Sequence, residues 1–301
     1  MVRAPLNVDT MDVGPKTLFT TLQDLLACPQ CGSALTFDPP DIRCTGCGAR
    51  HPQRRADCLD LMPIEETLSG DEWAARQQEM EKWYVELVDK NWSRSCFTND
   101  YGPFRSILQT YTGTVLDLGG GAGVTRHYLR ADVRYVVVDP SLMWLGGEWT
   151  TLADQFPSLA APPAFVRGTG EALPVRSRAL DVVLAFWALN HATDLPRIFH
   201  QVARALRPGG RFLCVLEDME PGWRDVVRPA MRRRGLLSML ALALQKVKAA
   251  LPGQEWSLQE DHIRIRESDI RRWSADNFDI VSRAWIGNYL TYELVARDGR
   301  A

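Results

Sequence analysis

Four cysteines near the start of the chain form two matched Cys-x-x-Cys-Gly pairs, Cys28 with Cys31 and Cys44 with Cys47. Four thiolates in two close pairs can complete a tetrahedron around Zn²⁺, and the glycine after each pair permits a turn that directs backbone N–H groups at the sulfurs. A redox dithiol is the alternative, but it needs a strand-to-helix setting that this Gly- and Pro-rich stretch does not offer. We therefore predict a structural zinc site, since four cysteine ligands leave no position for a substrate.

A second candidate site is the glycine-rich sequence Asp117-Leu118-Gly119-Gly120-Gly121-Ala122-Gly123. Glycines let the backbone turn sharply and pass close to a ligand. Val124 stands where the dinucleotide fingerprint needs a third small residue, and the Gly-Lys-Ser/Thr ending of a phosphate-binding P-loop is absent. Asp139 follows at about the twenty-residue distance at which an acidic group reaches ribose hydroxyls, although it could instead cap a helix before Pro140. These residues predict a nucleoside site.

Short apolar runs predict the strands that position these residues. The runs are 114–118, 135–139, 164–167, 180–185, 211–217, 278–285 and 289–296. Ser141 and Asp194 are candidate N-caps, and the Pro208-Gly209-Gly210 turn ends the helix that begins near Asp194. The alternation of strand, turn and helix predicts an α/β fold with a Rossmann-like, mostly parallel seven-stranded sheet and helices on both faces.

Changes in residue composition divide the chain into four parts. We expect a loose leader over 1–21, a small metal-stapled ribbon over 22–63, a helical linker and substrate-side cap over 64–100, and the main α/β domain over 101–301. We predict an amphipathic helix over 71–89 within the linker. We interpret the helical pattern over about 218–262 as an insertion that forms a lid.

Overall composition limits the partners of the chain. A formal net charge of −2 and an isoelectric point near 6.2 supply no broad positive field for binding nucleic acid. The most apolar stretch, 236–251, contains Gln245, Lys246 and Lys248 and is too short and charged to span a bilayer. Seven cysteines without an export signal predict a reducing, cytoplasmic location.

The cysteine-containing segment from Leu26 to Pro63 resembles the Trm112-like zinc ribbon that precedes many bacterial methyltransferases. It departs from that pattern at Asp57-Cys58-Leu59, where the family has a Gly-Ile-Pro-like turn, and no metal ligand is affected. The glycine loop resembles that of class I S-adenosylmethionine (SAM)-dependent methyltransferases. The sequence Leu206-Arg207-Pro208-Gly209-Gly210 resembles a turn of ubiquinone/menaquinone-type methyltransferases.

This resemblance implies a SAM cofactor and a set of residues that bind it. The set is Asp117, Gly119, Gly120, Gly121, Asp139, Pro140, Thr169, Gly170, Glu171 and Phe186. The family usually has Asp where Thr169 stands, so only a hydroxyl is present there to accept a hydrogen bond from the adenine amino group.

The acceptor is expected beyond the carboxyl ends of the strands, near Trp187, Asn190 and His191. His191 is the candidate general base because an imidazole titrates near neutral pH, and the alternative is a hydrogen bond within its own turn. Aromatic residues near the expected mouth, Trp144 among them, are packing anchors or a lid over a planar or apolar acceptor.

Three functions are compatible with these features. The first is O- or N-methylation of a small molecule. The second is methylation of an rRNA or tRNA base with the zinc ribbon holding RNA, but the arginines of the ribbon are opposed by Asp38, Asp41, Asp57 and Asp60. The third is a non-catalytic protein that binds SAM or a partner, which would predict a degraded glycine loop. The acceptor, the oligomeric state and any role of the ribbon beyond structure stay open.

Overall fold

The computed structural model describes residues 15–63, 77–78, 81–82, 98–145, 164–216, 263, 265–287 and 289–298. Most of the expected amphipathic helix over 71–89 and the whole expected lid over 218–262 lie outside these residues. The last residue of the expected strand 211–217 and the first fourteen residues of the expected leader also lie outside the described residues. Among the described helices, none combines the length and apolarity needed to cross a membrane.

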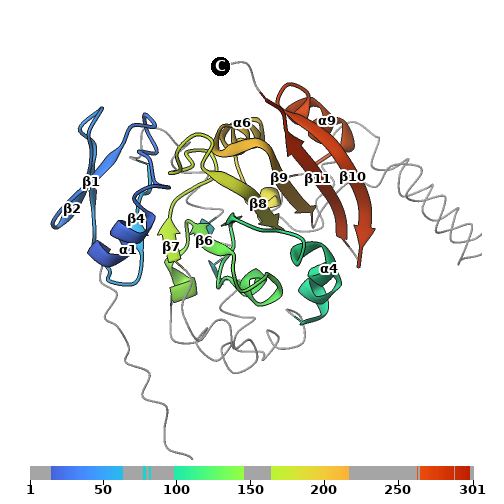
Figure 1. Cartoon of the computed structure of the whole chain (residues 1–301), viewed down its shortest axis with the longest axis horizontal. Coiled ribbons are helices and arrows are strands. Elements are labelled where there is room, and N and C mark those ends of the chain that lie inside the picture. Colours follow the sequence, from blue (N-terminus) through green and yellow to red (C-terminus); the bar gives the residue numbers. More distant parts are fainter. Residues whose placement is uncertain are drawn as a thin grey trace, which may run out of the picture.

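The main sheet contains the seven expected strands and an eighth from the ribbon, in the order β10-β11-β9-β8-β5-β6-β7-β4 (Figure 1). Its strands are β4 (Leu59–Asp60), β5 (Thr114–Leu118), β6 (Arg134–Asp139), β7 (Ala164–Arg167), β8 (Leu180–Phe186), β9 (Leu206–Leu216), β10 (Phe278–Ile286) and β11 (Tyr289–Ala296). The strands from β9 to β4 pair in parallel, and β11 pairs antiparallel with both β9 and β10.

Strand β9 begins earlier than the sequence pattern predicts. Leu206 pairs with Leu180 before a bulge, and regular pairing resumes where Arg211 faces Val182. Gly209 takes a positive φ of 77° within this irregular stretch. Helix α6 (Leu195–Ala205) ends just before it, and the expected N-cap of α6 is confirmed because the Asp194 side chain accepts a hydrogen bond from the Arg197 N–H.

The N-terminal part comprises helix α1 (Pro15–Leu22) and an antiparallel sheet of β1 (Leu35–Asp38), β2 (Asp41–Cys44) and β3 (Arg50–Pro52). The expectation of a loose leader is wrong for residues 15–21, because they form most of α1. Leu18, Phe19 and Leu22 of this helix are buried in the main hydrophobic core. Burial of this apolar face accounts for the order of the segment.

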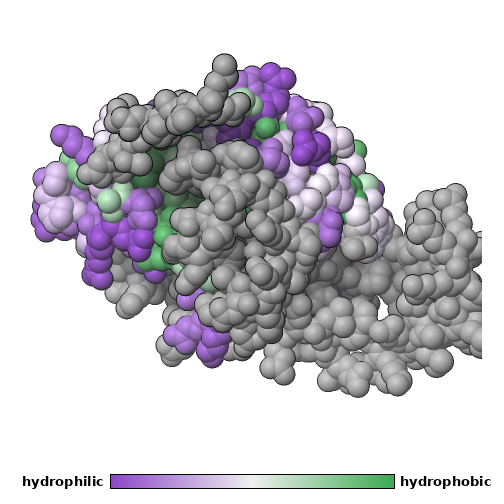
Figure 2. All heavy atoms as spheres, turned by 90° about the horizontal axis from the view of Figure 1, so that it is seen from below, coloured by the Kyte–Doolittle hydropathy of each residue, from purple (hydrophilic) through white to green (hydrophobic). Residues whose placement is uncertain are grey.

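The ribbon is joined to the α/β domain by backbone pairing, ion pairs and a shared core. Strand β4 pairs in parallel with β7 at one edge of the main sheet, and Asp60 forms an ion pair with Arg167 at 3.0 Å. A second ion pair, at 2.7 Å, joins Asp24 to Arg134 at the start of β6. The view in Figure 2 shows hydrophilic side chains over the ribbon end of the molecule and apolar side chains beside them.

Two buried apolar clusters lie on opposite sides of the sheet, because successive side chains of a strand point to opposite faces. In β6, Val136 and Val138 belong to one cluster, and Tyr135 and Val137 belong to the other. The first cluster takes in residues of α1, α6 and α9 (Glu267–Ser274). The second takes in residues of α4 (Arg105–Leu108) and the short 3-10 helices η2 (Gly102–Phe104), η3 (Val124–Tyr128) and η4 (Leu142–Leu145).

Candidate functional site

A pocket opens at the carboxyl ends of β5, β6, β7 and β8, which is where ligands bind in open α/β sheets. It encloses about 710 Å³, counting its open mouth. Eight of the predicted site residues line it, namely Gly119, Asp139, Pro140, Thr169, Gly170, Glu171, Phe186 and His191. Residues from four separate loops therefore meet around one space.

The glycine loop forms one wall of this pocket. Gly119 has a left-handed φ of 65°, and a Cβ added there would lie 2.4 Å from the Cβ of Ala188 on the opposite wall. Gly121 also has a positive φ, of 53°, and a Cβ there would meet the Trp144 ring at 3.0 Å. Only glycine fits at these two positions without moving its neighbours.

Asp139 ends β6 with its carboxylate buried at the pocket wall. Its Oδ2 accepts a hydrogen bond from the Gly121 N–H at 3.0 Å, and its Oδ1 accepts one from the Ser141 N–H at 2.8 Å. Burial raises the pKa of Asp139 to about 7, against the lowering effect of these two hydrogen bonds. A ligand that adds hydroxyl donors here would favour the ionised form.

Asp117 lies outside the pocket lining that most of the other predicted cofactor residues share. Its Oδ2 accepts hydrogen bonds from the hydroxyls of Thr125 and Tyr135, and the side chain is fully buried. Burial raises the pKa of Asp117 to about 6, although both hydrogen bonds lower it. Asp117, Gly120 and Gly121 are not part of the pocket lining. Asp117 therefore supports the glycine loop from the side that faces away from the pocket, through its bonds to Thr125 and Tyr135.

The segment after β7 forms the far wall. The Gly168 N–H donates to the Asp139 carbonyl at 3.2 Å, which ties this wall to the end of β6. The Thr169 hydroxyl is buried and has no hydrogen-bond partner among the described residues. Glu171 is fixed, since its Oε1 accepts a hydrogen bond from the Thr193 N–H at 3.0 Å. Since the described residues leave the Thr169 hydroxyl without a partner, it can bind a ligand.

The end of β8 supplies the remaining wall. Phe186, Trp187 and His191 line the pocket there. Asn190, which the sequence places near the acceptor, is instead fully buried and donates from Nδ2 to the Ile263 carbonyl at 3.2 Å. Its role is to hold the segment around residue 263 against the domain.

Gln77 and Trp144 are among the lining residues that the predicted site set does not include. Gln77 Nε2 donates to Glu81 Oε1 at 3.2 Å, and Ser141 Oγ donates to the same oxygen at 2.7 Å. These contacts bring the linker to the end of β6. The i, i+4 spacing of Gln77 and Glu81 was a visible signal for one helix face, but nothing local indicated that this face meets the pocket.

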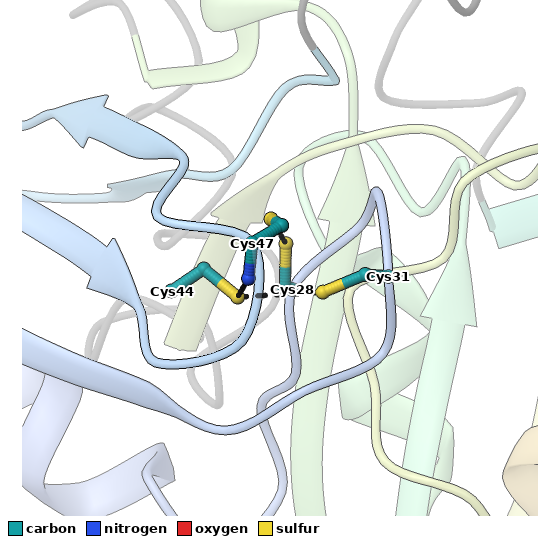
Figure 3. Close-up of side chains that lie close together, drawn as sticks. All are labelled: Cys28, Cys31, Cys44 and Cys47. Atoms are coloured by element: carbon teal, nitrogen blue, oxygen red, sulfur yellow. Dashed lines mark hydrogen bonds between the residues drawn. The ribbon is translucent and has the colours of Figure 1, made fainter.

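The four predicted zinc ligands lie together, as Figure 3 shows. Their sulfurs are all within 4.8 Å of one another, with Cys28 and Cys47 separated by 3.7 Å and Cys31 and Cys44 by 3.4 Å. A tetrahedral zinc site with Zn–S bonds of about 2.3 Å places its sulfurs about 3.8 Å apart. The N–H groups of Gly46 and Cys47 point at the Cys44 sulfur, at 3.3 and 3.4 Å. The cluster therefore fits a structural Zn²⁺.

Comparison with known proteins shows what the pocket-bearing domain is similar to. Residues 116–214, from β5 to β9, match a sequence family described as "Methyltransferase domain". The ubiquinone/menaquinone biosynthesis C-methyltransferase UbiE of Rubrivivax gelatinosus is 34% identical over 119 residues, which cover 36% of this chain and 41% of the relative. The enzyme of the same name from Acidiphilium cryptum is 32% identical over 145 residues, covering 40% of this chain and 52% of the relative. The chain thus spans about half the length of these relatives, or less.

Among the solved structures similar to this chain is the Burkholderia thailandensis 1,6-didemethyltoxoflavin-N1-methyltransferase with bound 1,6-didemethyltoxoflavin and S-adenosylhomocysteine. The TM-score is 0.51 at 17% identity, and the match covers 88% of this chain and 99% of that chain. This similarity shows the methyltransferase fold.

Proposed function

We propose that this chain, whose residues 116–214 match the methyltransferase domain family, transfers a methyl group from SAM to a small-molecule acceptor. The observation that carries the proposal is the meeting of Gly119, Asp139 and Thr169 around one pocket at the carboxyl edge of the sheet. Each comes from a different strand end, and each is of the type that a nucleoside needs there.

The residues of the pocket fit this cofactor. The buried Asp139 carboxylate would accept hydrogen bonds from the ribose hydroxyls. The Thr169 hydroxyl, which has no partner among the described residues, would accept one from the adenine amino group. Gly119 allows the loop to lie close to Ala188, which a side chain at this position would prevent. When bound, SAM supplies an electrophilic methyl group on a positively charged sulfur.

His191 is the proposed base for a hydroxyl or amine acceptor, because it lines the same pocket beside Trp187. The acceptor must lose a proton as its oxygen or nitrogen bonds to the methyl carbon, and the imidazole would take that proton. The two relatives are named C-methyltransferases, so a carbon acceptor is the alternative chemistry.

Methylation of RNA is less well supported by the ribbon. Arg43 pairs with Asp38 at 2.9 Å, and Arg55 pairs with Asp57 at 2.6 Å. Arginines that are neutralised by neighbouring carboxylates make a weak electrostatic surface for phosphates.

Calorimetric titration with SAM and with S-adenosylhomocysteine tests the cofactor part of the proposal. We expect both to bind to the full chain, and failure of both to bind would remove the enzyme function. Incubation with isotopically labelled SAM, in parallel with a metabolite extract and with total RNA, tests the acceptor part. Label in a small metabolite is the expected outcome, and label in RNA alone would favour the second function.

A further inference from the structure

One residue that lines the cofactor pocket lies outside the segment that matches the methyltransferase domain family. That match covers residues 116–214, and the other lining residues lie between Leu118 and Ile198. Gln77 belongs to the linker that precedes this segment. The linker therefore contributes a polar side chain to the pocket wall.

Gln77 lies on a face of the linker that is turned toward the α/β domain. Gln77 and Glu81 are half-buried, whereas their neighbours Gln78 and Lys82 are exposed. The Gln77 Nε2 donates a hydrogen bond to Glu81 Oε1 at 3.2 Å, as side chains four residues apart on a helix can. Because a carboxylate only accepts hydrogen bonds, this contact fixes the orientation of the Gln77 amide.

Glu81 joins this face to the end of β6. The buried Ser141 hydroxyl donates to the same Glu81 oxygen at 2.7 Å, and the Ser141 N–H donates to Asp139 Oδ1 at 2.8 Å. Asp139 is the residue to which the proposed function assigns the ribose. A short chain of hydrogen bonds therefore places Gln77 at the ribose end of the pocket.

The Gln77 amide keeps a hydrogen-bonding group that can serve a ligand. One of its two N–H groups binds Glu81, and the other has no partner among the described residues. A ribose hydroxyl that donates its hydrogen to Asp139 still has oxygen lone pairs, and an ionised carboxylate has no hydrogen to offer them. The second N–H of Gln77 is such a donor, so the two side chains complement each other around one hydroxyl group.

We propose that Gln77 is a further cofactor-binding residue, which donates a hydrogen bond to one ribose hydroxyl, and that Glu81 and Ser141 position it. This inference rests on the proposed use of SAM as the methyl donor. It extends the cofactor site from the strand ends of the α/β domain to the linker. The domain supplies the carboxylate that accepts from the hydroxyl, and the linker supplies the donor.

Calorimetric titration of the full chain with S-adenosylhomocysteine tests the contact. Gln77→Ala should weaken binding about fivefold, which is the usual net effect of one hydrogen bond. Gln78→Ala is the matched control, because it removes the same side chain from the next residue, which is exposed and does not line the pocket. This control should bind as tightly as the unaltered chain.

Two cofactor analogues show whether the effect comes from the ribose. The 2′-deoxy and 3′-deoxy analogues of S-adenosylhomocysteine each lack one hydroxyl. Gln77→Ala should weaken one of them about fivefold, as it does S-adenosylhomocysteine, and should weaken by less than about twofold the analogue that lacks the hydroxyl bound by Gln77. A substitution that merely disturbed the fold would weaken all three ligands by the same factor.

Substitution of Glu81 tests the positioning part. Glu81→Ala removes the acceptor that holds Gln77 and should weaken S-adenosylhomocysteine binding about threefold. Glu81→Gln keeps a carbonyl oxygen that can accept the hydrogen bonds of Gln77 and Ser141, so it should recover most of this loss. Combined with Gln77→Ala, Glu81→Ala should cause little further loss, since both changes act on one contact.

The inference is overturned if Gln77→Ala binds S-adenosylhomocysteine as tightly as Gln78→Ala does, or if it weakens both deoxy analogues equally. Equal losses in Glu81→Ala and Glu81→Gln would overturn the positioning role of Glu81. Failure of S-adenosylhomocysteine to bind to the unaltered chain is a separate result, because it removes the proposed function itself.

Discussion

The zinc ribbon and the cofactor pocket reach their geometry by opposite routes. All four ribbon ligands lie between Cys28 and Cys47, on strands and turns of a few residues, and one metal ion can hold them. The pocket collects residues from Gly119 to His191 through parallel strands that pair across long stretches of chain. Ligands that are close in the sequence can thus stabilise the ribbon through one metal ion, whereas packing between distant segments stabilises the pocket. The two regions should respond differently to metal loss, pH and single substitutions.

The largest expected effect is the loss of zinc. Cys47→Ser removes one of four thiolate ligands, so zinc content measured by mass spectrometry should fall and the free energy of unfolding should drop by several kcal/mol, since metal binding contributes directly to folding. Because α1 and β4 share the main core, the whole chain should melt earlier. Cys58→Ala, at a buried cysteine outside the cluster, is the control and should keep its zinc. Full zinc content in Cys47→Ser would contradict this account.

The next effect is a pH dependence that belongs to the pocket. The pKa of Asp139 rises from 3.8 to about 7 on folding, so the folded chain binds more protons than the unfolded chain between these values. The contribution of the Asp139 carboxyl to the free energy of unfolding is fully present below pH 4. As pH rises through 7 this contribution is lost, which lowers the free energy of unfolding of the ligand-free chain by roughly 2–4 kcal/mol. Asp139→Asn should remove this part of the slope in chemical unfolding experiments between pH 4 and 7. An unchanged slope would mean that the carboxyl is not desolvated.

A smaller effect is expected at the glycine loop. Gly119→Ala places a Cβ 2.4 Å from that of Ala188 and forces a left-handed φ on alanine. We expect a loss of about 1–2 kcal/mol in stability and at least a tenfold loss in affinity for S-adenosylhomocysteine, measured by calorimetry. Gly102→Ala, where an added Cβ meets nothing within 4 Å, should change neither quantity appreciably. Equal effects of the two substitutions would show that the close approach to Ala188 is unimportant.

The smallest effects compare two ion pairs of the ribbon. Asp60→Asn breaks the pair with Arg167, which joins the ribbon to β7, and should lower stability by about 1 kcal/mol. Arg55→Ala breaks a more exposed pair within the ribbon and should change stability by at most about 0.5 kcal/mol. Thermal unfolding of both variants in low and high salt distinguishes them. The reverse order would show that the contact with β7 contributes little.

Much of this arrangement was predictable because its signals are local. Apolar runs predicted the bounds of β5, β7 and β8 closely, since a strand that is buried on both faces of a parallel sheet is a nearly continuous run of apolar residues. Two Cys-x-x-Cys-Gly pairs were enough to predict the ligand cluster that the structure brings together. The meeting of Gly119 and Asp139 at one pocket could be predicted because a strand end, a turn and a carboxylate at a fixed distance form a recognisable pattern.

The orientation of some side chains depends on which distant segments meet in the fold, and no local sequence pattern indicates those contacts. Asp117 is turned under the loop because Thr125 and Tyr135 reach its carboxylate, and Asn190 faces residue 263 instead of the pocket. These side chains lie within correctly predicted segments. Their orientation was decided by partners elsewhere in the chain.

The sequence by itself determined the strand set, the cysteine cluster and the glycine loop, because each rests on residue type and short-range spacing. Tertiary structure alone decided that the two-residue β4 extends the main sheet and that Glu81 of the linker meets Ser141 after β6. A strand as short as β4, with two residues, has no hydrophobic periodicity that could be recognised in the sequence. The backbone groups at a sheet edge can pair with any segment that the fold brings next to them.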